Sequence, residues 1–185
     1  YSTTLNNTTP YTGASHIISD TLYLGSRVDA EADGQPVADG AAATNDDVTN
    51  AANGVGGVGD DEDGIVFVNS LIAGQIVTVE VTVTGDGGYL SGWLDFGADG
   101  AWTQARDQIF DGVAVSNGLN VLTFTVPLTA STNITTYARF RLSTEADLNF
   151  YDAAGPASDG EVEDYDVLIE KFDLALVKTV AATSD

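Results

Sequence analysis

The sequence contains no cysteine and few positively charged residues. The absence of cysteine excludes disulfides, thiolate metal sites and cysteine nucleophiles. Lys and Arg together number 6, against 28 for Asp and Glu, which gives a formal net charge of -22. Because nucleic acid and anionic membrane surfaces would repel such a chain, we expect neither as a partner.

Long apolar runs are also missing. None approaches the roughly 20 residues that a membrane-spanning helix needs, so we expect no direct membrane insertion. The chain starts without a signal peptide, and we therefore expect a mature or excised form. Of the 28 acids, 21 are Asp, a residue that favours turns and is the usual oxygen donor of calcium loops. This Asp-rich, Lys-poor composition is typical of secreted bacterial surface proteins.

Five segments alternate apolar and polar residues in the manner of half-buried strands, and we expect the last of these strands to start at Tyr165. The clearest is residues 75–84, in which valines face one way while threonines and a glutamate face the other. In residues 136–143, Arg139 and Arg141 fall on the outward face, and we expect one or both to clamp acids of the Glu161–Asp164 group. Binding of an acidic ligand is the alternative interpretation. The expected inward residues are Val77, Val79, Val81, Val83, Leu90, Leu94, Phe96, Leu122, Phe124, Val126, Ala138, Phe140, Leu142, Tyr165, Val167 and Ile169.

Strands spaced by Gly, Asp and Asn turns predict an all-β fold, an antiparallel β-sandwich of the jelly-roll or Ig-like kind. Residues 30–64 differ, because they are rich in Asp, Gly, Ala and Asn and have little to bury. A loop of that length is uncommon in a compact domain, so we expect bound metal to order it. We assign residues 1–171 to one domain and residues 172–185 to a terminal strand or linker.

The terminal segment has an apolar face formed by Phe172, Leu174 and Leu176. One interpretation is that it pairs within its own domain. The other is that it completes a sheet in a neighbouring subunit or domain, because an exposed edge strand is a template for pairing.

Four acidic stretches place oxygen ligands at the short spacing of calcium loops. Calcium takes 6–8 oxygens at about 2.3–2.6 Å, and acids at alternate positions before a glycine suit a loop that curls round the ion. None of the stretches is an EF-hand, and a solvated acidic surface is the alternative interpretation of each. We predict Ca²⁺ as the cofactor, at one or two shared sites; the candidate ligands are Asp29, Glu31, Asp33, Asp46, Asp47, Asp60, Asp61, Asp63, Asp95, Asp99, Glu161, Glu163 and Asp164.

Two other functions are weighed against a structural one. His16 is the only histidine and has no nucleophile elbow nearby, so we expect it to make structural hydrogen bonds and expect no enzyme. An aromatic platform formed by Tyr89, Trp93 and Trp102 would instead make the chain a carbohydrate-binding module that recognises glycans.

A family resemblance rests on several segments, which include "DDEDGIVF", "GYLSGWLDFGADGAW", "ARFRLS" and "SDGEVEDYDV". Together they resemble the GEVED domain, a module of large bacterial extracellular proteins, over about residues 11–169. The resemblance implies a cell-surface or secreted β-sandwich whose matching acids bind cations. Gly97 stands where an Asn ligand is frequent in the family. The tail "FDLALVKTV" resembles the first strand of the repeat domains that follow in adhesin-like proteins.

The expected function is therefore a calcium-stabilised extracellular structural or adhesion module. A fibre subunit that assembles by exchange of its terminal strand is one form of this hypothesis. The expected partners are copies of the chain itself or adjacent surface-protein domains.

Overall fold

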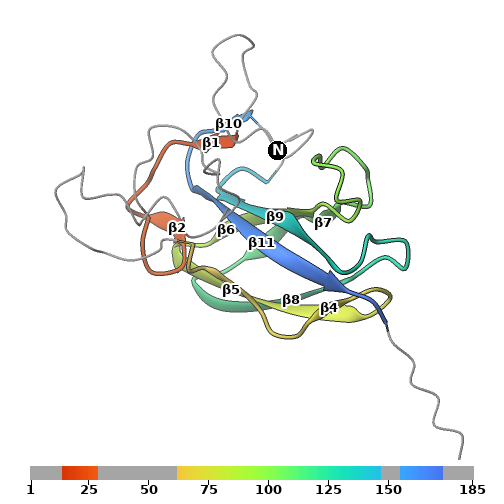
Figure 1. The fold of residues 1–185 in the computed structure, drawn as a ribbon. Helices are drawn as coiled ribbons and strands as arrows, with labels where there is room; N and C mark the ends of the chain where they lie inside the picture. Colours follow the sequence, from red (N-terminus) through yellow and green to blue (C-terminus); the bar gives the residue numbers. More distant parts are fainter. Residues whose placement is uncertain (1–13, 29–61, 147–154, 173–185) are drawn as a thin grey trace, which may run out of the picture.

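The computed structural model describes residues 14–28, 62–146 and 155–172, and in these ranges the chain is all-β (Figure 1). The strands are β1 (Ala14–His16), β2 (Leu22–Leu24), β3 (Ile65–Phe67), β4 (Leu71–Ile72), β5 (Ile76–Gly85), β6 (Gly88–Leu94), β7 (Gln108–Val115), β8 (Gly118–Thr125), β9 (Ile134–Ser143), β10 (Gly155–Ala157) and β11 (Glu161–Glu170). The described part contains no helix that is long and apolar enough to cross a membrane.

Two sheets pack face to face as a β-sandwich. The first has five strands in the order β4-β11-β9-β6-β7, and all its pairs are antiparallel except β11 with β4. In the second, β5 is central, with β2 and β3 on one side and β8 on the other, all antiparallel. A short parallel pair, β1 with β10, lies outside the two main sheets (Figure 1). The predicted β-sandwich is thus confirmed.

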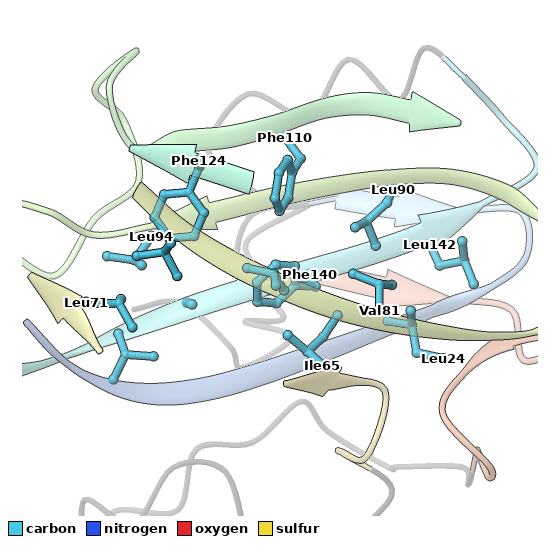
Figure 2. Close-up of a cluster of buried hydrophobic side chains, with 14 of the residues drawn as sticks. Leu24, Ile65, Leu71, Val81, Leu90, Leu94, Phe110, Phe124, Phe140 and Leu142 are labelled. Carbon is cyan, nitrogen blue, oxygen red and sulfur yellow. The ribbon is translucent and has the colours of Figure 1, made fainter. Parts of the chain in front are cut away.

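One continuous apolar core fills the space between the sheets (Figure 2). Phe140 lies at its centre, with its ring centroid 6.0 Å from those of Phe67 and Tyr165 and 6.4 Å from that of Phe110. The valines of β5 are 0–1% exposed, as their alternation predicts. The other inward predictions are confirmed too, with Leu122 and Tyr165 only partly buried.

Strands β2 and β3 are two halves of one interrupted edge strand. Both pair with the same side of β5, where Leu24 is opposite Val83 and Ile65 is opposite Val81. Between the halves, Thr82 bonds to both segments: its carbonyl accepts from Gly25 N at 2.9 Å, and its N–H donates to the Gly64 carbonyl at 2.8 Å. The acidic segment between the halves therefore leaves the sheet and returns to it at one point. Residues 29–61 themselves lie outside the described residues, so the expected ordering by metal stays a prediction.

The outer face of β9 is covered instead of open. Arg139 is 2% exposed and Arg141 is 0% exposed, although alternation predicts an outward face for both. The short β1–β10 pair covers Arg141, and the loop between β6 and β7 brings Trp102 over Arg139. Covering segments that are distant in sequence explain the difference.

Candidate functional site

The acids of Glu161–Asp164 lie within β11, not in a loop ahead of it. Successive side chains of a strand point to opposite faces, so Glu161 and Glu163 face inward while Asp164 faces outward. The three carboxylates are thereby separated into two environments. The sequence-based expectation of a strand that starts at Tyr165 places the boundary too late.

Glu161 and Glu163 connect the two sheets of the sandwich. Glu161 Oε2 accepts a hydrogen bond from the backbone N of Leu24 at 2.6 Å, and Glu163 Oε1 accepts one from Gly64 N at 3.0 Å. The second oxygen of Glu163 accepts from the Tyr165 hydroxyl at 2.9 Å. Both carboxylates are buried, at 6% and 1% exposure. A carboxylate that accepts N–H bonds in a buried site forms strong, charge-assisted hydrogen bonds, so these two acids hold β11 against β2 and β3.

Tyr165 extends this contact. Its hydroxyl oxygen accepts from Ile65 N at 3.2 Å while its proton goes to Glu163. Burial, and then the neighbouring Glu163 carboxylate, raises the pKa of the Tyr165 hydroxyl far above its ordinary value. The phenol therefore stays protonated and donates throughout the physiological range.

Asp63 closes the base of the acidic segment. Its carboxylate accepts from Ser26 N at 2.8 Å and from the Ser26 hydroxyl. The adjacent Gly25 has a φ of +63°, and a Cβ placed there would lie 1.5 Å from Asp63 Oδ1. Gly64 also has little space, since its Cβ would be 2.7 Å from Gly25 N. We call Leu24–Ser26, Asp63, Gly64, Glu161 and Glu163 the loop base.

Asp164 forms the predicted ion pair with Arg139. Arg139 Nε donates to Asp164 Oδ1 at 2.7 Å and Nη2 donates to Oδ2 at 2.5 Å. The guanidinium carbon lies 4.7 Å from the centroid of the Trp102 ring, which is a cation–π contact. The sequence-based expectation that an arginine clamps one of these acids is confirmed for Arg139.

Arg141 has different partners. Its Nε donates to His16 Nε2 at 2.9 Å, and its Nη2 donates to the carbonyls of Gly155 and Ser15 at 2.7 and 3.3 Å. His16 Nδ1 donates in turn to the Asp159 carbonyl at 2.6 Å. Burial, and next the Arg141 charge, lowers the pKa of His16 to about 3, so the imidazole is neutral. Arg141 therefore ties β1 and β10 to β9, and the expected structural role of His16 is confirmed.

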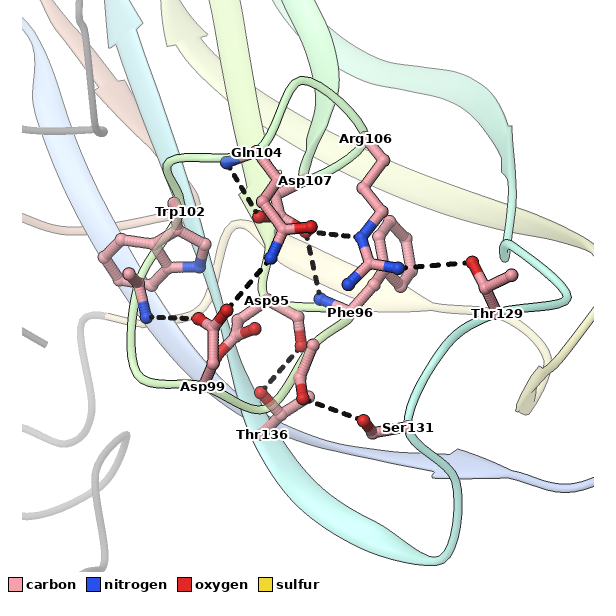
Figure 3. A network of polar contacts seen from close by, with 12 residues as sticks. Asp95, Phe96, Asp99, Trp102, Gln104, Arg106, Asp107, Thr129, Ser131 and Thr136 are labelled. Carbon is pink, nitrogen blue, oxygen red and sulfur yellow. Dashed lines mark hydrogen bonds and ion pairs between the residues drawn. The ribbon is translucent and has the colours of Figure 1, made fainter.

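The loop that follows β6 gathers three further aspartates (Figure 3). Asp95 Oδ2 accepts from Gly100 N at 2.9 Å, and Asp99 accepts from Ala101 N at 3.1 Å and from the Gln104 side chain at 2.9 Å. Asp107 accepts from Gln104 N at 3.2 Å. Burial raises the pKa of the Asp107 carboxyl. These bonds fold the loop upon itself.

A cation between Asp95 and Asp99 would meet a positive neighbour. A Cβ on Gly97 would lie 3.3 Å from Asp95 Oδ1 and 3.2 Å from Asp99 Oδ2, but also 3.2 Å from Arg106 Nη2. The guanidinium of Arg106 therefore adds positive charge close to both carboxylates. Like charges repel, which lowers the electrostatic gain from a metal ion here.

The described residues test the candidate metal ligands only in part. Within these ranges, no group of three or more His, Asp or Glu side chains could hold a metal ion. Asp63, Glu161, Glu163 and Asp164 each bind groups of the chain itself. Asp29, Glu31, Asp33, Asp46, Asp47, Asp60 and Asp61 lie outside the described residues, so Ca²⁺ binding there stays a prediction.

The three aromatic residues do not form an open platform. Trp93 is 2% exposed and Trp102 is 6% exposed, and the two pack together with Tyr137. Only Tyr89 keeps partial exposure. A sugar ring needs an accessible aromatic face for stacking, so these tryptophans serve the packing of the outer layer.

Sequence reasoning missed some participants of these contacts. Ser26 and Asp107 were not singled out, and neither were the hydroxyl of Tyr165 and the hydrogen-bond partners of Asp159. Asp159 accepts from the Ser143 hydroxyl at 2.7 Å and from Thr144 N at 2.9 Å. The Asp-Gly sequence of Asp159 and Gly160 signals a turn, but the Thr144 backbone that Asp159 contacts is 15 residues away.

Comparison with known families adds to this geometry. Comparisons with curated proteins and with solved structures gave no match. The family model of the GEVED domain matches residues 89–168, from β6 to β11. Strands β1–β5 precede the matched region, yet β2 and β5 share its hydrophobic core. The match contains Glu161, Glu163 and Asp164, and it makes residues 89–168 similar to the GEVED domain.

Proposed function

We propose that the chain is a structural module of an extracellular or cell-surface assembly. The GEVED domain is a surface-type module, which gives the setting. One observation carries the structural role: the two glutamates of the GEVED motif reach from β11 to the backbone of β2 and of Gly64, in the opposite sheet. The motif thus supplies bonds between the two sheets.

The proposal predicts that these bonds resist mechanical separation of the sheets. The test is single-molecule pulling on wild-type chain and on a variant that carries both Glu161→Gln and Glu163→Gln. Asp166→Asn is the matched control, because Asp166 lies on the same strand and is exposed. We expect a lower unfolding force for the double variant and an unchanged force for the control. Equal forces for all three proteins would contradict the structural role of the motif.

We propose in addition that calcium stabilises this structural module. Its support is the sequence of the acidic segment, which leaves and returns to the sheet at the loop base, where Asp63 accepts from Ser26. Close carboxylates repel, and a bound divalent cation offsets that repulsion. We expect chelation by EDTA to lower the melting temperature by several degrees, and added calcium to restore it. Magnesium, which prefers near-ideal octahedral geometry, serves as the control ion. An unchanged melting temperature would contradict the calcium hypothesis.

Three further hypotheses concern the same module: adhesion, strand exchange by residues 172–185, and glycan binding. Phe172, the last described residue, is 48% exposed. A glycan array separates the carbohydrate alternative from the structural one. Binding of the folded chain to glycans on the array would favour a carbohydrate-binding module, and a silent array would count against it.

A further inference from the structure

Strand β8 is an edge strand that lacks the usual protection of edges. It pairs with β5 over all eight residues, from Gly118 opposite Val83 to Thr125 opposite Ile76, without a bulge. Among the described residues, no strand pairs with its other edge. β8 contains no charged residue and no proline. Natural sheets protect their edges with charges, prolines, bulges or very short strands, and β8 has none of these.

The other edges in the described part of the chain each have such a device. β7 carries the exposed Asp111 and pairs with β6 through two register shifts. β4 has two residues, and β2 and β3 have three residues each. β1 and β10 have three residues each, and one residue of β10 is Pro156. Among the edge strands of the described residues, β8 therefore differs in having no such protection.

The backbone groups on the free side of β8 can be assigned from the register. N–H and C=O groups of alternate residues point to opposite edges of a strand. On β5, the even-numbered Thr78 and Thr82 bond toward the β2–β3 side. The odd-numbered residues of β5 therefore bond to β8, where their partners are even-numbered. It follows that Leu119, Val121 and Thr123 direct their N–H and C=O groups to the free edge.

The side chains beside this edge are apolar and nearly uncharged. Leu119 is 61% exposed and Val121 is 60% exposed on the outer face of the second sheet. On that face the described part of β3 and β5 contributes Val66, Ile76, three threonines and a single charge, Glu80. In a chain of net charge -22, this face is a place where a second acidic molecule could approach without close contact between carboxylates.

We infer that the free edge of β8 pairs with β8 of a second copy of the chain. A two-fold axis at Val121 makes the pairing antiparallel. It places Val121 opposite Val121 of the second copy and Leu119 opposite Thr123. A charged residue there would face an identical charge, and β8 has none. The paired strands would join the two copies into one continuous sheet. This inference rests on the proposed role as an assembly module, for which it names the partner and the surface.

The test is the mass of the purified chain in solution by light scattering, over a wide range of concentration. We expect a rise from 19.2 kDa toward twice that mass, with more dimer at higher salt because screening weakens the repulsion between acidic copies. Val121→Pro removes an N–H from the free edge and should leave a monomer. Val121→Thr keeps the N–H and the β-branched shape, so it should dimerise like the wild type.

If circular dichroism shows that Val121→Pro does not fold, Val121→Lys decides, because two lysines would meet at the axis. Wild-type chain that stays monomeric at every concentration and salt would overturn the inference. Dimers that persist in a folded Val121→Pro or Val121→Lys variant would overturn it as well. Either result leaves the pulling experiment on Glu161 and Glu163 unaffected, so the two proposals fail separately.

Discussion

Arg139 and Asp164 lie directly opposite each other on neighbouring strands, and both nitrogen–oxygen pairs of the bidentate contact are 2.7 Å or shorter. Trp102 covers the guanidinium from one side. The guanidinium is thus fixed by the strand register, by two charge-assisted bonds and by an aromatic ring. It stands on the face of β9 that is opposite the hydrophobic core.

Arg139→Lys should destabilise the protein although it keeps the charge. An ammonium group cannot form the two parallel bonds and stacks less well on indole. We expect a loss of about 1–2 kcal/mol in the free energy of unfolding, measured from urea midpoints. Arg106→Lys is the control, because its side chain is 32% exposed and its ion-pair distance is 3.7 Å. A loss no larger than that of the control would contradict a specific role of the Arg139 geometry.

The neutral His16 predicts a pH dependence of stability. Its pKa in the folded protein is about 3, below the ordinary value of 6.5, so the unfolded state binds the proton first. Stability is therefore complete above pH 6.5 and is lost as the pH falls toward 3. By about pH 4.5 the loss should reach about 2–3 kcal/mol. Urea unfolding at several pH values measures it, and His16→Gln should remove most of the slope.

Asp159 also makes the stability depend on pH, but in a lower pH range than His16 does. Hydrogen bonds from Ser143 and Thr144 outweigh the effect of burial and lower the pKa of Asp159, so its stabilisation is lost at still lower pH. The comparison with His16→Gln at each pH isolates the histidine. Equal slopes for wild type and variant above about pH 4.5 would show that His16 is not buried in the neutral form.

Gly64→Ala tests the close approach of the two halves of the interrupted strand. The added Cβ would lie 2.6 Å from Leu24 Cβ and 2.7 Å from Gly25 N, so the halves must move apart. We expect a loss of about 2 kcal/mol or more, together with faster protease cleavage in the acidic segment. Gly100→Asn is the control, because Asn tolerates a positive φ and nothing lies within 4 Å of its Cβ position. Equal stability of both variants would argue against tight packing at the loop base.

Local alternation was sufficient to predict the core. The period of two in β5 and β9 placed the valines, Ala138, Phe140 and Leu142 correctly, because one face of each strand meets the other sheet. Alternation also showed that Arg139 was available to an acid of β11. The burial of Arg141 was not predictable, since His16 is 125 residues away from it and no local pattern links them.

For the acidic residues, too, the sequence shows the local spacing but not the distant groups that they contact. Their sequence spacing suggests a shared cation, because a strand that starts at Tyr165 leaves Glu161–Asp164 in a loop. In the structure the strand starts at Glu161, and its pleat sends Glu161 and Glu163 to the core side and Asp164 to the other. Which backbone N–H groups they meet depends on the sandwich packing, which the sequence of β11 does not specify.

The role of the motif glutamates in joining the sheets is tested most directly by the free energy of unfolding of Glu163→Gln, measured beside that of Asp166→Asn. Both changes neutralise one acid on β11, but Glu163 accepts from Gly64 N and Tyr165 whereas Asp166 is exposed. If the motif glutamates join the sheets, Glu163→Gln should lose about 2 kcal/mol and Asp166→Asn should stay within about 0.5 kcal/mol of the wild type. Equal stability of the wild type and Glu163→Gln would contradict the role of Glu163 in joining the two sheets.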